Sequence, residues 1–505
     1  MEHRLCHEGC ADGTRVNTAP RGIDPRPWPW LLLGVALLAL TQVRAGIGVL
    51  AWIAPVPWLR YLRLTSGLRS RASFAAVLFA AWTLTTAKIA SESMFLTLAP
   101  LFALPIAVSQ LGAYLTWDTL RRRVTPALAA MAFALALATG EWVIYALTPF
   151  GSWGATAYTQ LDDLPLLQAA SVVGIAGVGA VVSFASAAIE GALASGKDAS
   201  ALLGWSMGIV GGAHAAGTAR LFAADIAQQE TVTVAAIATD SDVRGTPLPS
   251  REVTHQWDRA LLERTRAAAR GGAVLAVWPE AATLVWPDEE DAWVASVRNV
   301  ALSDGIDVVA AYVTPITTKP LAYRNELRFV LRDGHVEAPY AKHHPVPGEP
   351  AVAGRGPAPL VQRDWGRLSG AICYDYDFPG AGLERGRLGA DLVAVPASDW
   401  RGIDPVHAQM AAVRAVESGH SILRSTRWGL SLAVDPYGRP RAWHSAFEPA
   451  KAGVMFAQLP RGHLRTLYSI WGDTPLLVVA LSLAGFIWRR SPALRIRPGD
   501  ANVPR

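Results

Sequence analysis

The chain has 505 residues and a formal net charge of +5 at pH 7. Hydrophobic residues make up 51% and charged residues only 17%, with a mean hydropathy of +0.24. These values exclude an ordinary cytosolic enzyme and are typical of a membrane protein with one globular part. The arginines gather at the ends of apolar stretches, so the positive charge indicates membrane topology and not a nucleic-acid-binding surface.

Residues 1–28 are predicted to form a polar tail. Cys6 and Cys10 lie here beside His3 and His7. Such a cluster could bind a metal, but no second ligand pair follows it, and we interpret the segment as a disordered tail. No clear cleavage site follows the first apolar run, which therefore predicts an anchor and not a removed signal peptide.

Apolar runs recur between residues 29 and 222, and one more covers 467–488. A bilayer core needs about 20 helical residues, so the pattern predicts about eight membrane helices. The first two runs are short, with Arg44 between them, and are either two short helices or one broken helix. The seven runs before the soluble part are 29–43, 46–59, 73–90, 94–117, 125–147, 166–190 and 202–222.

Basic residues fill every second connection between these runs. Cytoplasmic loops carry the excess of Lys and Arg, so with eight helices both termini are cytoplasmic and the soluble domain lies on the outer side. Glu141 is near the outer end of the fifth run, where it is either capped by its neighbours or faces a water-filled cleft. The basic residues are Arg60, Arg63, Arg69, Arg71, Arg121, Arg122, Arg123, Lys197, Arg489, Arg490, Arg495 and Arg497.

Between about residues 230 and 460 the pattern changes to short strands that alternate with helices. This alternation predicts a layered α/β domain, followed by a basic tail at 489–505 after the last membrane helix. Strands are expected at 231–239, 273–278, 306–312, 326–332, 367–373, 392–396 and 430–435. Helices are expected at 251–270, 288–302, 381–389 and 405–418.

Three residues of this domain offer the groups needed for acyl transfer through a thioester. Glu280 and Cys373 each follow a predicted strand, where catalytic residues often gather. A carboxylate can take the proton of the thiol, and the ammonium of Lys342 can stabilise an oxyanion. Each residue alone is more often structural or on the surface, so the hypothesis depends on their conjunction.

These motifs resemble those of the nitrilase (carbon–nitrogen hydrolase) superfamily, whose members fold as an αββα sandwich. Within it, the placement of membrane helices before and after the domain resembles the apolipoprotein N-acyltransferases. The matching segments are 278–280 (WPE), 342–349 (KHHPVPGE), 372–375 (ICYD), 398–400 (SDW), 407–410 (HAQM), 414–417 (RAVE), 423–426 (LRST), 151–153 (GSW), 158–160 (YTQ) and 471–472 (WG).

The resemblance implies that Cys373 takes an acyl chain from a phospholipid and passes it to the amine of a diacylglyceryl-cysteine lipoprotein. Glu280 would then be the base, Lys342 would hold the oxyanion, and Glu349 would support the lysine. It also implies a bacterial cytoplasmic (inner) membrane location with the domain outside. The sequence shows no dinucleotide fingerprint, phosphate loop or credible metal site, so we expect no cofactor. Further candidates are Tyr374 and Asp375 as supporting residues, and Trp153, Trp278, Asp399, Trp400, His407 and Glu141 as substrate-binding residues.

The chain departs from the family pattern at three places. Asp375 stands where these acyltransferases usually carry glutamate, Arg427-Trp428 replaces two asparagines, and the loop from Glu349 to Cys373 is short. The short loop keeps two alternatives open. One is a membrane-anchored amidase in which water is the acceptor, and the other is a structural or interaction protein that retains the three residues.

Overall fold

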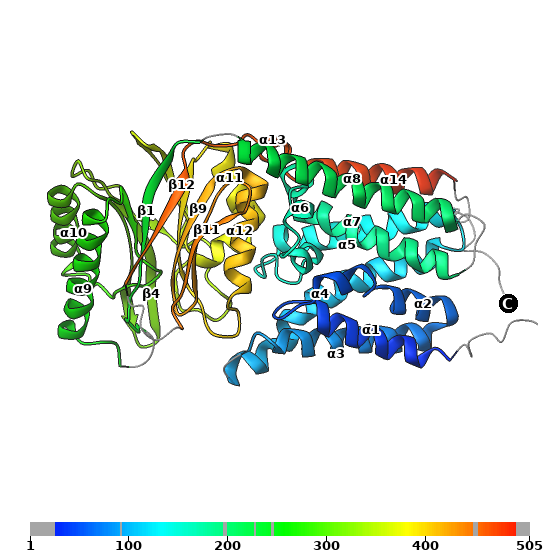
Figure 1. Cartoon of the computed structure of the whole chain (residues 1–505). Helices are drawn as coiled ribbons and strands as arrows, with labels where there is room; N and C mark the ends of the chain where they lie inside the picture. The colour runs from blue at the N-terminus through cyan, green and yellow to red at the C-terminus, as the bar shows by residue number, and fades with distance from the viewer. Residues whose placement is uncertain are drawn as a thin grey trace, which may run out of the picture.

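The computed structural model describes residues 26–90, 93–194, 199–226, 229–243, 247–447 and 453–490. The expectations for residues 1–25, including the cysteine–histidine cluster, and for 491–505 lie outside this range. A helical part occupies one end of the molecule and a β-rich part the other (Figure 1).

The β-rich part contains two six-stranded sheets. The first has the order β12-β1-β2-β3-β4-β5 and the second the order β11-β10-β9-β8-β7-β6. The strands of the first are β1 (Thr231–Ile237), β2 (Leu275–Val277), β3 (Asp307–Thr318), β4 (Leu321–Val330), β5 (Tyr340–Ala341) and β12 (Val454–Pro460). Those of the second are β6 (Leu360–Arg363), β7 (Gly366–Gly370), β8 (Leu392–Ser398), β9 (Ser421–Arg427), β10 (Leu430–Val434) and β11 (Pro440–Ser445).

Central strands are buried on both faces, which explains why their sequences are apolar without alternation. In β8, Leu392 and Ala394 join the core between the two sheets, whereas Val393 and Val395 face a helical layer. The side-chain period of two therefore sends neighbouring residues into different cores. Strand β2 follows the same rule, because Val277 lies between the sheets and Ala276 lies under the outer helices.

Two pairs of helices complete the layers. The helices α9 (Arg251–Arg270) and α10 (Glu290–Asp304) cover the first sheet, and α11 (Pro379–Arg387) and α12 (Val406–Ser418) cover the second (Figure 1). The predicted αββα sandwich is confirmed.

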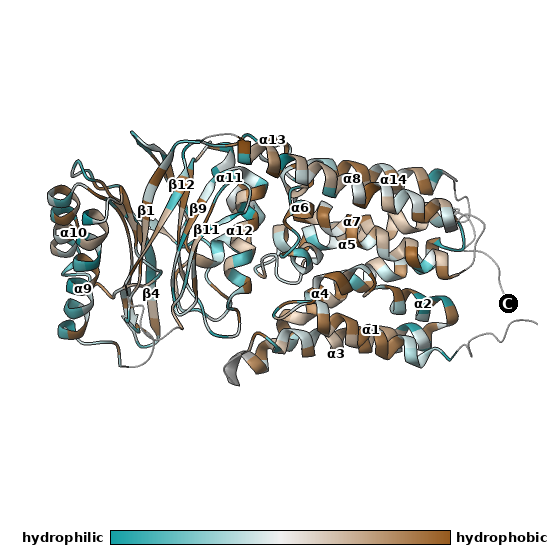
Figure 2. Ribbon diagram, viewed as in Figure 1, coloured by the Kyte–Doolittle hydropathy of each residue, from teal (hydrophilic) through white to brown (hydrophobic). Residues whose placement is uncertain are grey.

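The helical part consists of ten helices in the described residues, and apolar residues prevail along most of them (Figure 2). They are α1 (Trp28–Thr41), α2 (Val56–Leu64), α3 (Leu68–Ala87), α4 (Ser93–Leu120), α5 (Pro126–Leu147), α6 (Leu164–Leu167), α7 (Ala170–Leu193), α8 (Ala199–Ile226), α13 (Leu467–Trp471) and α14 (Thr474–Arg490).

The prediction of about eight membrane-spanning helices is wrong in number. Within the described ranges, three helices are long and apolar enough to cross a membrane: Leu96–Leu120, Pro126–Leu147 and Ala170–Leu193. The run 46–59 does not form one helix, because Pro55 lies between a 3-10 turn (Gly48–Trp52) and the nine-residue α2, and Pro57 is in the first turn of α2. Helices α1 and α14 are also short, and α3 and α8 are long enough but interrupted by polar residues.

Helix α12 joins the two parts of the molecule. One of its faces packs on the second sheet through Ala408 and Ala411, and the other packs on the helical part through Met410 and Val413. It is buried almost along its whole length, which is unusual for the outer helix of a sandwich. The helical part therefore acts as a further layer of the domain.

Basic residues gather at the end of the helical part that lies away from the sheets. Arg63 donates two hydrogen bonds to the buried Glu190 near the end of α7, at 2.6 and 2.5 Å. Arg71 and Arg121 both pair with Asp118 near the end of α4. Three connections that the sequence predicted to be on one side thus meet there, and α14 ends at the same end (Figure 1).

Candidate active site

Glu280, Cys373 and Ser398 lie at one end of the two sheets. Glu280 and Cys373 each follow the carboxyl end of a parallel strand, β2 and β7, and Ser398 ends β8. The backbone N–H of Glu280 donates to the carbonyl of Ala397 in the other sheet, at 3.2 Å. This hydrogen bond connects the two sheet ends and fixes the strand ends that hold the site.

Lys342 is a buried charge of the site. Its ammonium donates to Glu280 Oε1 and to Glu349 Oε2, at 2.8 Å each. Burial alone would lower the pKa of Lys342, but the two carboxylates outweigh it and hold the pKa well above its ordinary value. The lysine is therefore a fixed positive charge, and the predicted support by Glu349 corresponds to a direct ion pair.

Asn325 on β4 belongs to the same cluster and was missed in the sequence. Its Nδ2 donates to Glu280 Oε1 at 2.8 Å and to Glu349 Oε1 at 3.2 Å, so it separates two carboxylates that would otherwise repel. The backbone carbonyl of Asn325 also accepts the N–H of Lys342 at 2.8 Å. A lone Asn in a strand has no sequence signal for such a role.

Cys373 begins a short 3-10 turn, η3 (Cys373–Asp377), in a backbone conformation that L-residues rarely adopt. Its φ is 48°, in the left-handed region, which is costly for a residue with a Cβ and is often found at functional sites. The buried thiol lies 3.7 Å from the carbonyl oxygen of Ser398. Burial raises the pKa of this thiol and Glu280 adds to the effect, while Lys342 opposes it.

Asp375 stabilises the turn η3 through hydrogen bonds and is not among the residues that line the cavity beside Cys373. Its Oδ2 accepts from the Ile372 N–H at 3.0 Å and from the Tyr340 hydroxyl at 2.9 Å. Its Oδ1 accepts the backbone N–H groups of His343 and His344, at 3.1 and 2.8 Å. One carboxylate thus ties the turn of Cys373 to the loop that begins at Lys342.

His407 lies on the other side of the thiol. Its Nδ1 is 2.7 Å from Asp399 Oδ1, and its Nε2 is 2.9 Å from Asp377 Oδ1. Arg424 donates to both oxygens of Asp399, at 2.7 and 3.1 Å. Asp399 therefore binds both His407 and Arg424 through its carboxylate oxygens, and it is not among the residues that line the cavity. Asp377 and Arg424 were not singled out from the sequence.

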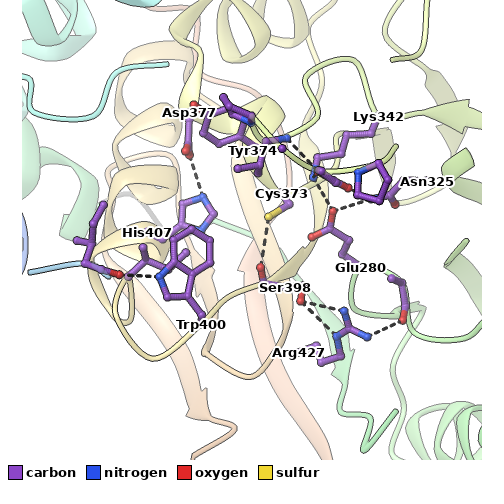
Figure 3. A pocket seen from close by; sticks show the side chains of 18 of the residues that line it. Glu280, Asn325, Lys342, Cys373, Tyr374, Asp377, Ser398, Trp400, His407 and Arg427 are labelled. Atoms are coloured by element: carbon purple, nitrogen blue, oxygen red, sulfur yellow. Dashed lines mark hydrogen bonds and ion pairs between the residues drawn. The ribbon is translucent and has the colours of Figure 1, made fainter. Parts of the chain in front are cut away.

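An apolar cavity of about 390 Å³ connects these groups to the membrane helices. Glu280, Lys342 and Cys373 line its polar end, where their side chains point toward one space (Figure 3). This volume is in the range of small-molecule sites. The wall on the helical side is made of Val43, Thr86, Ile89, Ala99, Phe102, Ile106, Phe150 and Trp153.

Three predicted residues connect the cavity to the helical part. Tyr374 donates its hydroxyl to the carbonyl of Pro149 at 3.0 Å, and Trp400 donates its indole N–H to the carbonyl of Ile89 at 2.7 Å. Trp153 donates to Asp377 Oδ2 at 2.6 Å. All three line the cavity, so the site is built from both parts of the chain.

Two predicted residues lie elsewhere. Trp278 is fully buried under α9 and α10, where its indole N–H donates to Thr265 at 2.9 Å. Glu141 is buried in the helical part and accepts the N–H and hydroxyl of Thr156, at 2.8 and 2.6 Å. Neither residue is part of the cavity wall. Of the two alternatives for Glu141, its contacts correspond to a carboxylate capped by a neighbouring residue and not to one that faces a cleft.

One group of side chains near the thiol has donor types that metals use. Cys373, Asp399 and His407 place a sulfur, a carboxylate oxygen and a ring nitrogen within 4.8 Å of one another. Both nitrogens of His407 are engaged by carboxylates, however, and a metal ligand needs a free lone pair on the ring. The arrangement fits a hydrogen-bonded charge network better than a metal centre.

Two family models match the chain in sequence. Residues 28–188 match the apolipoprotein N-acyltransferase N-terminal domain, and residues 232–468 match the carbon–nitrogen hydrolase model. Among solved structures, an amidase from Nesterenkonia sp. is similar to half of the chain. It has 21% sequence identity and a TM-score of 0.39, and the match covers 50% of this chain and 97% of that one.

Curated relatives extend the similarity to both parts of the molecule. The apolipoprotein N-acyltransferase of Azotobacter vinelandii is 27% identical, over 94% of this chain and 93% of the relative. That of Bradyrhizobium diazoefficiens is 28% identical, over 71% of this chain and 73% of the relative. The chain therefore belongs to the apolipoprotein N-acyltransferase family, a membrane-embedded branch of the nitrilase superfamily.

Proposed function

We propose that this acyltransferase moves an acyl chain from a phospholipid, through a thioester on Cys373, to the N-terminal amine of a diacylglyceryl-cysteine lipoprotein. The observation that carries the proposal is the cavity. It joins a thiol, a carboxylate and an ammonium to an apolar wall built from helices α3 and α4. An acyl chain fits such a wall because burial of each CH₂ is worth about 0.8 kcal/mol.

In the first half-reaction Glu280 takes the proton of the Cys373 thiol, and the sulfur attacks the ester carbonyl of the phospholipid. Two N–H groups of the Lys342 ammonium donate to carboxylates, and we assign the third to the developing oxyanion. The intermediate then expels the glycerol oxygen, which receives the proton from Glu280. The products are a thioester on Cys373 and a lysophospholipid.

In the second half-reaction the neutral amine of the lipoprotein attacks the thioester carbonyl. Glu280 takes a proton from the attacking nitrogen, and the carbon–sulfur bond breaks. The proton then returns from Glu280 to the leaving sulfur. This restores the free thiol of Cys373 and the ion pair between the Glu280 carboxylate and the Lys342 ammonium. The buried ion pair of Glu280 and Lys342 keeps both groups in place through the two steps.

We also propose the boundaries and orientation of the chain. Residues 29–222 form the membrane region, 230–460 the catalytic domain, and 467–488 a final membrane segment. The basic end of the helical part, around Arg63, Arg71 and Arg121, would face the cytoplasm of a bacterium. The catalytic domain would then lie on the outer side of the inner membrane.

The test is formation of an acyl adduct. Membranes that contain the protein are incubated with a phospholipid labelled in its acyl chain, with a known apolipoprotein N-acyltransferase as positive control. A hydroxylamine-labile label on the peptide of Cys373 supports the proposal. Absence of that label while the control is labelled refutes it, and a label that persists in Cys373→Ala moves the nucleophile elsewhere.

A second arm separates transfer from hydrolysis. A synthetic diacylglyceryl-cysteine peptide is added to the labelled enzyme. Transfer of the label to the peptide amine supports an acyltransferase. Release of free fatty acid at the same rate with and without peptide indicates the amidase-like alternative, in which water is the acceptor.

A further inference from the structure

His407 is the centre of a buried chain of charges that passes directly beside Cys373. The chain runs from Arg424 through Asp399 to His407, and from there to Asp377. It continues into the helical part, because Trp153 donates to the second oxygen of Asp377 at 2.6 Å. The ring of His407 faces the cavity beside the thiol (Figure 3).

The two carboxylates on the ring fix its charge. Each ring nitrogen lies within hydrogen-bond distance of a buried carboxylate, at 2.7 and 2.9 Å, which favours the imidazolium, whereas the Arg424 guanidinium at 2.9 Å from Nδ1 opposes it. Burial alone would lower the pKa of His407, but Asp377 and Asp399 raise it to about 9. Asp399 stays ionised, because Arg424 and His407 hold its pKa at about 2 despite burial.

His407 also holds the turn of the nucleophile at its far end. Cys373 is the first residue of η3 and Asp377 is the last. Asp375 fixes the turn to the loop of Lys342, whereas Asp377 fixes it to His407 and Trp153. A turn that starts at φ 48° needs such ties on both sides to keep its conformation.

The position of His407 places its charge close to the sulfur. A nitrogen of His407, an oxygen of Asp399 and the sulfur of Cys373 lie within 4.8 Å of one another. Glu280 and Lys342 act on the thiol from the other sheet, and Arg424 lies against both Asp399 and the His407 ring, 2.9 Å from Nδ1. The formal charges of Arg424, Asp399, His407 and Asp377 sum to zero, and loss of the imidazolium would leave this group at −1.

We propose that His407 is a positively charged positioning residue at neutral pH, which holds the nucleophile turn through Asp377 and keeps the buried charge group beside Cys373 neutral. The inference rests on Cys373 as the nucleophile of the proposed function. Without the imidazolium, the thiolate of Cys373 would form next to a group with a net charge of −1.

The test measures the charge next to the sulfur without any lipid substrate. The full chain with Cys6→Ser and Cys10→Ser is treated with iodoacetamide between pH 6 and 11, and alkylation of Cys373 is followed by mass spectrometry. Between pH 6 and 8, where His407 is charged, we expect alkylation in His407→Asn to be at least about tenfold slower than in the wild type, and the difference should shrink above pH 9, where the wild-type ring is neutral. Because no acyl donor is present, this result is independent of whether an acyl adduct forms.

His420→Asn is the matched control. His420 is also fully buried and contacts the same turn, through Tyr376 at 3.0 Å, but burial lowers its pKa to about 3 and the ring is uncharged. We expect the ratio of this control's alkylation rate to the wild-type rate to be the same at all pH values. A ratio for His407→Asn that is equally independent of pH overturns the proposal.

Asp377→Asn decides the matter if His407→Asn does not fold. It removes a negative charge from the same group and leaves the imidazolium in place, so alkylation between pH 6 and 8 should be faster than in the wild type. A faster rate supports the proposal, and an unchanged or slower rate overturns it.

Discussion

Asp375 gives the sharpest test of how the nucleophile turn is held. In Asp375→Asn, the remaining side-chain oxygen can keep the hydrogen bonds from the N–H groups of His343 and His344. The NH₂ group then takes the place of Oδ2, which accepts from the Tyr340 hydroxyl and the Ile372 N–H. The Tyr340 hydroxyl can rotate to accept, but the N–H of Ile372 is left facing a donor. An unsatisfied buried donor costs about 1–3 kcal/mol, and the lost charge on the remaining bonds adds about 1 kcal/mol.

This estimate predicts a loss of about 2–4 kcal/mol of stability. For a domain of this size it corresponds to a fall of roughly 4–16 °C in the apparent melting temperature, which intrinsic tryptophan fluorescence in detergent can follow. Acyl-adduct formation at a temperature where the variant is folded should fall further, because the turn of Cys373 loses its tie to the Lys342 loop. A variant with unchanged melting and unchanged adduct formation would refute the reasoning.

A glutamate in place of Asp375 should not preserve the site. Asp375 is fully buried, and each of its oxygens already accepts at 2.8–3.1 Å. One extra methylene has to be accommodated in this space, and such overpacking costs about 1–3 kcal/mol. Asp375→Glu is therefore expected to melt lower than the wild type, and a higher melting temperature would show that the pocket has room that the contacts do not reveal.

Three further predictions test the cavity and its charges. Asn325→Leu removes the donor between Glu280 and Glu349 and should slow adduct formation about 10- to 100-fold, as labelling kinetics would show; an unchanged rate would separate Asn325 from catalysis. Ile106→Trp fills the apolar wall, so adduct formation with long-chain phospholipids should fall more than with short-chain ones in the same assay, and an equal loss would place the acyl chain elsewhere. The pKa of His407 is raised, so the stability that it contributes is complete below pH 6.5 and is lost as the pH rises through about 9. Melting curves should show a loss of about 3 kcal/mol across this window that His407→Asn lacks, and equal slopes would contradict the charged state.

Much of the domain was predictable because local patterns and tertiary structure agree. The helix expected at 251–270 is observed at Arg251–Arg270, where an apolar stripe faces the first sheet and charged residues face away. Short apolar runs gave β1, β2 and β8, because strands buried on both faces need no polar side. The place of Glu280 and Cys373 after such strands was therefore open to prediction.

Strand β9 shows why the rest was not. Ser421–Arg427 is buried at every position although most of its residues are polar, so hydrophobic periodicity gives no signal. Its polar groups are satisfied by tertiary partners: Arg424 by Asp399, and Ser425 by the carbonyl of Ile237 at 3.0 Å. Asn325 was hidden for the same reason, since its partners lie far along the chain.

The contacts between the two parts of the molecule explain why this family joins a nitrilase domain to membrane helices. Tyr374 and Trp400 donate hydrogen bonds to backbone carbonyls of the helical part, and Asp377 accepts one from the indole of Trp153. Without these partners, the three polar groups of the catalytic domain would need water at the cavity. The same helical segments supply the apolar wall that runs from the membrane side to the thiol. The helices thus complete the site as well as anchoring it, because one set of residues both orders the turn of Cys373 and shapes the apolar cavity beside it.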